Sequence, residues 1–551
     1  MSSPGAEAPP GRAQGRSQAG PDPLGGSDGV PAGRGAPVNL PAPLHGSSLI
    51  LGTLALSLAT FMNVLDSSIA NVSLPAIAGD LGVSPVQGTW VITSFGVANA
   101  ISVPLTGWLT RRFGAVRLFT TSVLLFVLAS WLCGFAHSLE MLVACRVLQG
   151  LVAGPMIPLS QTLLLSSYPR EKAGTALALW GVTTLVAPVV GPLLGGWITD
   201  NISWPWIFYI NVPVGLFAAF LTWTIYHKRE TPTAKLPIDG VGLALLVIWV
   251  GAMQLMLDKG KELDWFASGE IQILAVTAVV GFLFFLIWEL YNEHPVVDLR
   301  LFAGRNFAVG AGTLSVAYGL FFGNVVLLPL WLQQWMGYTA TDAGMALAPV
   351  GLLAILLSPV VGKNVSRFDP RAMGTFAFVM FAVVLIMRSN FTTQTDFATI
   401  MVPTILQGAA LAFFFIPLTT LTLAGVSQDR LPAAAGLSNF VRITAGAMGT
   451  SIATTLWENR AALHHQHMVE NLGQGSTVAA EAVARMTSGG MSVEQAWAQI
   501  NRQIDQQAFT RAADDIFLVS AVLFLVLIAF IWMTRRPPKL VAAAVDAGGA
   551  H

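Results

Sequence analysis

Charged side chains are scarce in this sequence: Asp, Glu, Lys and Arg together make up 11% of its 551 residues. Soluble globular chains carry about 25% of these residues. Hydrophobic residues reach 54% here, so the composition excludes a soluble protein and predicts an all-α membrane protein that crosses the bilayer many times. The 29 basic and 29 acidic residues cancel, and nothing in this balance indicates a nucleic-acid partner.

Cysteine is also scarce. The two cysteines, Cys133 and Cys145, both lie in apolar segments, so neither a disulfide framework nor a cysteine-based metal site is expected. His464, His465 and His467 stand close together, but no matching set of further ligands accompanies them. No nucleophile–base motif occurs in the apolar segments either, and the sequence therefore predicts no metal, no cofactor and no enzymatic activity.

What the sequence has in abundance is long apolar segments. A transmembrane helix needs about 20 mainly apolar residues, and on that basis the sequence predicts fourteen spans. They are 48–73, 88–108, 116–136, 140–164, 174–198, 206–226, 239–258, 270–290, 306–332, 342–362, 371–389, 397–424, 435–457 and 514–534.

The two ends of the chain differ from these segments. Residues 1–47 are rich in Gly, Pro, Ala and Ser, a composition that cannot bury enough apolar surface to fold alone. We expect a disordered cytoplasmic tail there and a second cytoplasmic tail at 535–551. Lys and Arg concentrate in alternate loops and at the C-terminal end. Since such loops remain in the cytoplasm, both termini are predicted to be cytoplasmic.

An internal repeat predicts the domain organisation. Two motifs recur eight spans apart: Leu148-Gln149-Gly150 returns as Leu406-Gln407-Gly408, and Arg112-Phe113 returns as Arg367-Phe368. This recurrence predicts two six-helix halves separated by an inserted helix hairpin. The predicted limits are 48–226 for the first half, 239–290 for the hairpin and 306–534 for the second half.

A single carboxylate, Asp66, lies in the first predicted span. An ionisable side chain at the centre of a bilayer costs about 2.5–3.5 kcal/mol on insertion scales, and such residues usually handle ions or protons. We therefore expect Asp66 to carry protons. The alternative is that Asp66 snorkels or caps the end of its helix near Asn71 and Pro75.

Arginines also occur inside predicted spans. Arg146 lies in the fourth span, where its counterpart in the second half is Thr404. A permanent cation of this kind can tune Asp66 directly or through water, while the alternative is a structural arginine bonded to helix carbonyls. Arg442 is expected to be a second buried cation with a role in proton coupling, and Arg388 is expected to snorkel outward.

The loop between the second and third spans, from Gly107 to Arg117, resembles the cytoplasmic loop signature of the major facilitator superfamily. Gly107 and Gly114 permit close backbone approach and a tight turn, and Arg111 and Arg112 can reach carboxylates or helix C-termini of neighbouring spans. These four residues are expected to gate the transporter, although Arg111 stands where the signature normally has an acidic residue. The alternative is an ordinary positively charged loop.

The fifth span contains a glycine–proline pattern similar to the motif of antiporter branches of that superfamily. Its residues are Pro188, Gly191, Pro192, Gly195 and Gly196. Small residues allow helix backbones to touch, and Pro192 favours a bend. This arrangement is expected in a helix that rocks or seals during transport, with simple packing as the alternative.

With these motifs, residues 50–535 resemble the fourteen-span drug:proton antiporter branch of the major facilitator superfamily. The resemblance implies a multi-pass protein of the bacterial inner membrane that exports hydrophobic drugs against inward proton flow. It also implies a periplasmic membrane-fusion partner of the EmrA type and an outer-membrane channel of the TolC type. A solute:proton symporter is the alternative, and the fifth span argues against it.

Two further features complete the prediction. The substrate cavity is expected at mid-membrane between the halves, with polar or aromatic candidates Asn63, Asn99, Gln149, Phe321, Asn324 and Phe414, each of which packing explains equally well. The outward loop 458–513 is expected to form two soluble amphipathic helices, the second starting with a Ser492-x-x-Gln495 capping box. Because long patterned loops are usually functional, we expect this loop to dock the adaptor.

Overall fold

The structure is a computed structural model that describes residues 43–83, 85–169, 172–235, 237–365, 367–472 and 477–536. Regular structure in these residues is helical throughout, because apolar segments in a bilayer must satisfy their backbone hydrogen bonds internally. Of the two predicted tails, only residues 43–47 and 535–536 are described, and the remainder of both lies outside the described residues.

The helices follow the predicted spans to within a few residues, except that α1 continues to Asp80, past the predicted end at 73, and that the last two helices extend much farther than predicted. They are α1 (Gly46–Asp80), α2 (Pro85–Gly88), α3 (Trp90–Ser102), η1 (Val103–Leu105), α4 (Thr106–Phe113), α5 (Ala115–Gly134), α6 (Leu139–Ala153), α7 (Met156–Ser167), α8 (Ala173–Asn201), α9 (Trp206–Tyr209), α10 (Asn211–Tyr226), η3 (His227–Arg229), α11 (Gly240–Lys259), η4 (Trp265–Ala267), α12 (Gly269–Tyr291), η5 (Leu299–Ala303), α13 (Arg305–Gln334), α14 (Ala340–Leu347), α15 (Val350–Asn364), α16 (Pro370–Arg388), α17 (Phe397–Leu423), η6 (Gln428–Arg430), α18 (Leu431–Leu472), α19 (Thr477–Ser488) and α20 (Val493–Trp532).

Twelve helical segments of the described chain are long and apolar enough to cross a membrane. They coincide with twelve of the fourteen predicted spans. The other two predictions, 174–198 and 435–457, fall inside α8 and α18, which are long helices outside that group of twelve. The fourteen-span count therefore stays a prediction, while the all-helical, many-spanning character of the chain is confirmed.

Separate apolar cores form on the two sides of the inserted hairpin. One core draws only on residues between Leu56 and Tyr226 and includes the buried rings of Phe119 and Phe126. Another draws only on residues between Leu314 and Ile531. In the first group α1 packs against α8 and α10, and in the second α13 packs against α18. Each group of helices thus buries its own apolar surface.

The hairpin of α11 and α12 lies where these two groups meet. Its residues share a third core with α3 and α18, in which Trp249 packs edge-on against Phe440 at 5.8 Å between ring centroids. Ser451 of α18 also donates a hydrogen bond to the carbonyl of Leu257 at 3.2 Å. The hairpin therefore bridges the N-terminal and C-terminal helices along the α3–α18 seam.

Glycines make two close contacts between the two groups near the helix ends predicted to be cytoplasmic, and α8 also contacts α14 and α17. A Cβ added to Gly107 of α4 would lie 2.5 Å from Cβ of Ala433 in α18. A Cβ added to Gly362 of α15 would lie 2.6 Å from the carbonyl oxygen of Gly174 in α8. At both positions backbones approach so closely that only glycine fits without displacement.

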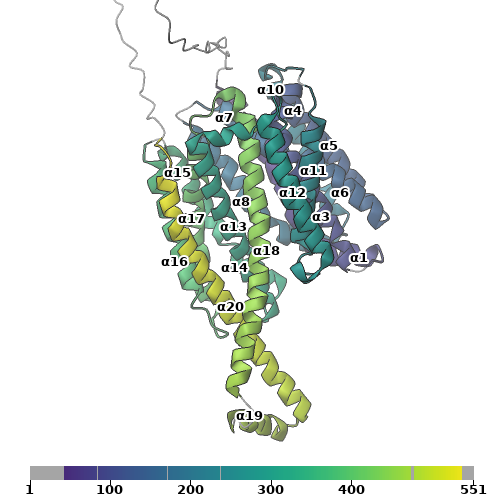
Figure 1. The fold of residues 1–551 in the computed structure, drawn as a ribbon, viewed down its shortest axis with the longest axis vertical. Helices are drawn as coiled ribbons and strands as arrows, with labels where there is room; N and C mark the ends of the chain where they lie inside the picture. Colours follow the sequence, from purple (N-terminus) through teal and green to yellow (C-terminus); the bar gives the residue numbers. More distant parts are fainter. Residues whose placement is uncertain are drawn as a thin grey trace, which may run out of the picture. The chain divides into compact units, whose positions relative to one another are not determined.

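The segment 458–513 differs from the prediction of a separate pair of soluble helices. Helices α18 and α20 continue without a break from the predicted spans into this segment and are joined through α19 (Figure 1). Trp457 donates a hydrogen bond to the carbonyl of Phe509 at 2.8 Å, which joins α18 to α20 where the extension begins. A continuous helix leaves fewer backbone N–H and C=O groups without partners than two helices separated by new ends would.

The predicted capping box at the start of α20 is confirmed. The backbone N–H of Gln495 donates to Ser492 Oγ at 3.2 Å, and the backbone N–H of Ser492 donates to Gln495 Oε1 at 2.9 Å. Two otherwise free donors at the helix start are thereby satisfied.

Helix α8 packs against α1 through glycines. A Cβ added to Gly195 would lie 2.7 Å from Ile69 Cγ1 and 3.0 Å from the Ile69 carbonyl oxygen, and one added to Gly191 would overlap Ser68 Oγ. Gly196 is looser, with Val72 Cγ1 at 3.9 Å. Two of the three candidate glycines of the fifth span therefore lie at the α1–α8 contact.

This contact predicts that Gly195→Ala lowers the thermal unfolding midpoint of the purified protein. Overpacking costs roughly 1–3 kcal/mol, which outweighs the gain in helix propensity. Gly181→Ala on the same helix is the matched control, since nothing lies within 4 Å of its added Cβ. A Gly195→Ala protein as stable as the Gly181→Ala protein would show that the α1–α8 contact is not tight.

Candidate functional site

Asp66 of α1 is fully buried and held by three side-chain donors. Its Oδ2 accepts a hydrogen bond from Arg146 Nη1 of α6 at 2.5 Å. Its Oδ1 accepts from Gln149 Nε2 at 2.9 Å and from Asn211 Nδ2 of α10 at 2.8 Å. Ser130 Oγ of α5 accepts from both amides, at 2.8 Å and 3.3 Å. Four helices therefore converge on one carboxylate, which neither snorkels nor caps the end of α1.

Arg146 is as deeply buried as its partner. Its Nε donates to the carbonyl of Val91 at 2.9 Å, and Nη1 also donates to Gln149 Oε1 at 2.7 Å. The guanidinium carbon lies 4.2 Å from the ring centroid of Phe95. Because Gln149 follows three residues later on the same helix, both side chains face Asp66. Arg146 thus makes both of the contacts that the sequence left open: it binds the Asp66 carboxylate directly, and it also binds a helix carbonyl.

This cluster is a buried ion pair in which both carboxylate oxygens of Asp66 accept hydrogen bonds, whereas Arg146 Nη2 has no hydrogen-bond partner among the described residues. Such a pair tolerates desolvation only when further hydrogen bonds compensate it, and removing one charge leaves the other uncompensated. Protonation of Asp66 would neutralise one partner and weaken its attraction to Arg146. Since both side chains have 0% exposure, proton exchange requires the surrounding helices to move.

The expectation that Arg388 snorkels outward is wrong. Arg388 of α16 is 1% exposed and its Nη2 donates to Gln407 Oε1 at 2.7 Å and to Thr404 Oγ1 at 3.2 Å, both on α17. The neighbouring amide and hydroxyl acceptors reduce the cost of this burial, while Arg388 Nε has no hydrogen-bond partner among the described residues. The internal repeat matches Gln407 to Gln149 and Arg388 to Cys133, whose Sγ lies 3.6 Å from Gln149 Oε1. The match between Gln407 and Gln149 in the internal repeat could therefore have indicated a buried polar cluster around Arg388.

Arg442 of α18 is buried near the contact between the two groups of helices. Its Nη2 donates to Asn439 Oδ1 at 2.6 Å, and Asn439 Nδ2 donates to Gln161 Oε1 of α7 at 3.1 Å. The guanidinium carbon lies 4.6–5.8 Å from the ring centroids of Tyr318, Phe415 and Trp180. Arg442 and Asn439 also line a small cavity of about 10 Å³. The predicted buried cation is thus surrounded by aromatic rings.

The six candidate cavity residues do not come together in the structure. Asn63 donates to the carbonyl of Ala153 at 3.1 Å, and Gln149 belongs to the Asp66 cluster. Asn99 of α3 is half-buried, and Asn324 donates to Ser520 Oγ at 3.0 Å. Asn63 and Gln149 therefore lie one turn apart along the α1–α6 contact, and Asn99 is beside them, since a Cβ added to Gly150 would lie 3.0 Å from its backbone nitrogen. Asn324 lies apart, among the C-terminal helices.

The two aromatic candidates lie in the core of the C-terminal helices. Phe321 and Phe414 both pack on the ring of Phe381, at 5.9 and 5.7 Å between centroids. Neither lines the cavity beside Arg442, whereas Trp180 and Gln161 do. Polar or aromatic character within a span was therefore not enough to single out Trp180 and Gln161, which the structure places beside Arg442.

The loop between α4 and α5 has an acidic partner that sequence analysis missed. Gly114 joins the two helices with φ of 88°, a left-handed conformation that favours glycine. Glu230, which follows α10 and η3, accepts hydrogen bonds from the backbone N–H of Val116 at 3.0 Å and of Arg117 at 2.8 Å. Its carboxylate caps the N-terminus of α5, where a negative charge is favourable.

Glu230 places an acidic group beside this loop, in which Arg111 stands where the signature normally has an acidic residue. The side chain of Arg111 is exposed and that of Arg112 is half-buried. The acidic group comes from a segment more than 100 residues away, so no motif within the loop could reveal it.

In the fifth span, α8 is continuous at Pro188 and Pro192, whose side chains lie outside the described residues, and the predicted bend stays a prediction.

No group of three or more His, Cys, Asp or Glu side chains that could hold a metal ion occurs in the described part of the chain. His464, the first of the three clustered histidines, instead lies 2.8 Å from Asp515 across α18 and α20. Arg460 contacts the same carboxylate at 2.8 Å. These side chains therefore join the two helices at the base of their extension.

Comparison with known proteins identifies the class. Residues 56–450 match the Major Facilitator Superfamily, and the chain belongs to this family. Its fold resembles the human organic anion transporter MFSD10 (TETRAN), with a TM-score of 0.55, 14% identity, and coverage of 88% of this chain and 100% of that one. At that identity the likeness concerns the fold alone.

Two bacterial relatives are much more similar in sequence. The chain is 52% identical to the multidrug export protein EmrB of Escherichia coli K12, over 92% of this chain and 99% of that protein. It is 49% identical to the fatty acid resistance protein FarB of Neisseria gonorrhoeae, over 90% of this chain and 98% of that protein. The predicted resemblance to EmrB-type multidrug efflux proteins is therefore confirmed, and these relatives are transporters rather than enzymes.

The cap on α5 predicts that Glu230→Ala destabilises the protein. Losing a side-chain cap costs about 0.5–2 kcal/mol, so the thermal unfolding midpoint of the purified protein should fall. Glu293→Ala is the matched control, because Glu293 is an exposed carboxylate just beyond α12. Equal unfolding midpoints for the two variants would contradict the capping role of Glu230.

Proposed function

We propose that the protein is a proton-driven multidrug efflux antiporter of the bacterial inner membrane. Its family and its relatives support transport, and the relative from Escherichia coli is named for multidrug export. The observation that carries the proton-coupling role is the ion pair of Asp66 and Arg146, buried inside the N-terminal helices. A titratable carboxylate at this depth is costly and is normally functional.

In this mechanism Asp66 alternates between an ionised and a protonated state. While it is ionised, the Coulomb attraction to Arg146 and the hydrogen bonds from Gln149 and Asn211 hold α1, α6 and α10 together. In a low-dielectric interior this attraction is much stronger than in water. A proton arriving from outside removes the negative charge and releases α1 from the other two helices. Loss of the proton to the cytoplasm restores the pair.

The packing of α1 gives this switch a route to the C-terminal helices. Ser68, two residues after Asp66, donates a hydrogen bond to the carbonyl of Ala187 in α8 at 3.4 Å. Helix α8 in turn packs against α15, where the backbones of Gly174 and Gly362 touch. A displacement of α1 therefore acts on α8 and, through it, on the contact between the two groups of helices.

Hydrophobic compounds would bind between these groups, beside Arg442. Trp180 of the N-terminal helices and Tyr318 of the C-terminal helices both face its guanidinium, and Asn439 joins α18 to α7 through Gln161. Aromatic rings with a few polar groups are typical of sites for drug-sized molecules. The cavity of about 10 Å³ would enlarge as these groups separate.

The extension formed by α18, α19 and α20 would bind a periplasmic membrane-fusion protein of the EmrA type. That partner would connect the transporter to an outer-membrane channel of the TolC type. Helix α18 continues 15 residues beyond the predicted span, or about 20 Å at 1.5 Å per residue. A helical extension of this length can present a rigid docking surface outside the bilayer.

Replacing Asp66 tests the proton role. Asp66→Asn should abolish proton-driven drug export by vesicles, because the amide cannot titrate, while the protein still inserts into the membrane. Asp80→Asn is the matched control: it makes the same change at the outer end of α1, where Asp80 accepts a hydrogen bond from Trp204. Export by Asp66→Asn at the rate of the Asp80→Asn control would refute the proton role.

Shortening the extension tests the docking role. Replacing residues 473–492, which include α19, with a short Gly-Ser linker preserves α18 and α20. The shortened protein should no longer confer drug resistance on cells or co-purify with the adaptor, but it should still transport in vesicles. If resistance and co-purification persisted, the docking role would be wrong; if vesicle transport stopped, the extension would belong to the transport cycle.

A further inference from the structure

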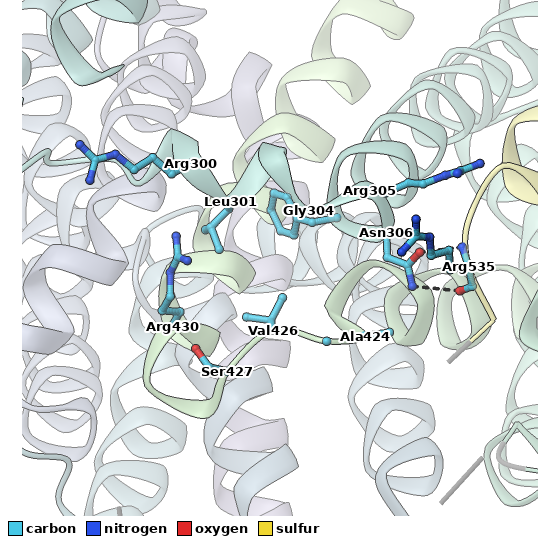
Figure 2. Close-up of a pocket in the computed structure, with 12 residues that line it drawn as sticks. Arg300, Leu301, Gly304, Arg305, Asn306, Ala424, Val426, Ser427, Arg430 and Arg535 are labelled. Atoms are coloured by element: carbon cyan, nitrogen blue, oxygen red, sulfur yellow. Dashed lines mark hydrogen bonds between the residues drawn. The ribbon is translucent and has the colours of Figure 1, made fainter. Parts of the chain in front are cut away.

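A pocket of about 370 Å³ lies among the ends of α13, α17 and α20, on the side that the basic loops predict to be cytoplasmic. Figure 2 shows the residues that line it. They come from η5, the first turn of α13, the segment between α17 and α18, and the chain just after α20. This pocket has no part in the transport mechanism proposed above.

The pocket is strongly basic. Four of its twelve lining residues are arginines, and none is acidic: the arginines are Arg300, Arg305, Arg430 and Arg535. Asp298, outside the lining, pairs with Arg430 at 2.5 Å and offsets one of the four charges. Arg305 Nε donates to the carbonyl of Met533 at 2.8 Å. Arg300 Nη2 donates to the carbonyl of Asn292 at 3.3 Å, and the side chains of Arg300 and Arg305 extend in opposite directions in Figure 2. Since each guanidinium has five N–H donors, donors remain for a ligand.

The start of α13 adds a second source of positive potential. Gly304 is its N-cap residue, so no side chain caps the helix, and its first turn carries no acidic residue. Residues Gly304–Phe307 line the pocket. The first N–H groups of a helix lack partners within it and attract anions. The pocket thus combines arginines with the uncapped N-terminus of a 30-residue helix.

Arg535 is held in place by its backbone rather than by its side chain. Asn306 Nδ2 donates to the Arg535 carbonyl at 2.9 Å, and the Arg535 N–H donates to Asn306 Oδ1 at 2.7 Å (Figure 2). Its position at the pocket therefore does not depend on the guanidinium. The side chain can be replaced without losing this connection between the start of α13 and the end of α20.

One edge of the pocket is close to lipid. Trp532 and Met533, at the end of α20, are 50% and 48% exposed, and Phe530 is also exposed. Exposed tryptophan at the end of a membrane helix is typical of the boundary between hydrocarbon and headgroups. Arg535 follows Met533 by only two residues, so the arginines lie at headgroup depth.

We propose that this pocket binds a phosphate group, and that the headgroup of an anionic phospholipid supplies it. Guanidinium groups bind phosphate oxygens through paired, charge-assisted hydrogen bonds, and the free N–H groups at the start of α13 add donors of the same kind. A bound headgroup joins α13, α17 and α20 at the membrane surface. The site is independent of Asp66 and of the proposed antiport mechanism.

The test uses the full-length protein in detergent. Native mass spectrometry measures retention of phosphatidic acid and of diacylglycerol with the same acyl chains, with and without inorganic phosphate as competitor. The variants are Arg535→Gln, which keeps the backbone pairing with Asn306, and the double variant Arg305→Gln with Arg535→Gln. Arg367→Gln removes an exposed arginine of another basic loop and is the matched control.

The wild type should retain phosphatidic acid in preference to diacylglycerol. Arg535→Gln should weaken this binding about tenfold, as expected for the loss of one charge-assisted contact, and the double variant should weaken it further. Arg367→Gln should bind as the wild type does. Thermal unfolding midpoints check that each variant is folded. If the double variant does not fold, the comparison of Arg535→Gln with the wild type decides the test.

Two results would contradict the proposal. If Arg535→Gln retained phosphatidic acid as well as the wild type, or if Arg367→Gln lost as much, the pocket would not be the binding site. If inorganic phosphate displaced the lipid with the same dependence on Arg535, the phosphate site would stand but its natural ligand would be a soluble anion. Without such displacement, the lipid headgroup is the ligand.

Discussion

A charged carboxylate can exist inside a bilayer-spanning helix bundle only if the protein supplies an opposite charge and enough hydrogen-bond donors. In this structure that requirement joins α1, α5, α6 and α10 around Asp66. The ion pair with Arg146 is favourable only as a complete unit, because either charge alone would remain buried and uncompensated. Protonation of Asp66 would therefore change the contacts of several helices, as the proposed antiport mechanism requires.

The internal repeat distributes charge unequally between the two sides of the molecule. The N-terminal cluster contains a carboxylate beside an arginine, whereas Arg388 on the C-terminal side binds only the amide of Gln407 and the hydroxyl of Thr404. The two clusters have glutamines at matching positions, Gln149 and Gln407. The arginine lies on α6 in the first cluster and on α16 in the second. The first arrangement contains a carboxyl group, which the proposed mechanism uses to carry protons, whereas the described hydrogen bonds of Arg388 include no acidic group.

Much of the fold was predictable from the sequence because lipid imposes a strong, local requirement on every spanning segment. Helix limits such as those of α12 and α16 follow directly from hydropathy, and Asp66 and Arg146 stood out as charges within apolar runs. Contacts between distant segments were not predictable in this way. Glu230 caps α5 from across the sequence, and Arg388 is buried because α17 presents two acceptors. The continuation of α18 and α20 was missed because hydropathy detects the end of a membrane span but not the end of a helix.

The position of the α11–α12 hairpin has a consequence for how a compound dissolved in the membrane reaches the protein interior. Helices α3 and α18 are joined by the hairpin through Trp249 and Phe440, so acyl chains and lipophilic solutes have no lateral path along that side. On the opposite side, α8 and α15 meet through the small residues Gly174 and Gly362, with no added helix described between them. Entry from the bilayer on that side would then require α8 and α15 to separate, because Leu177 and Val361 share a buried core at their contact.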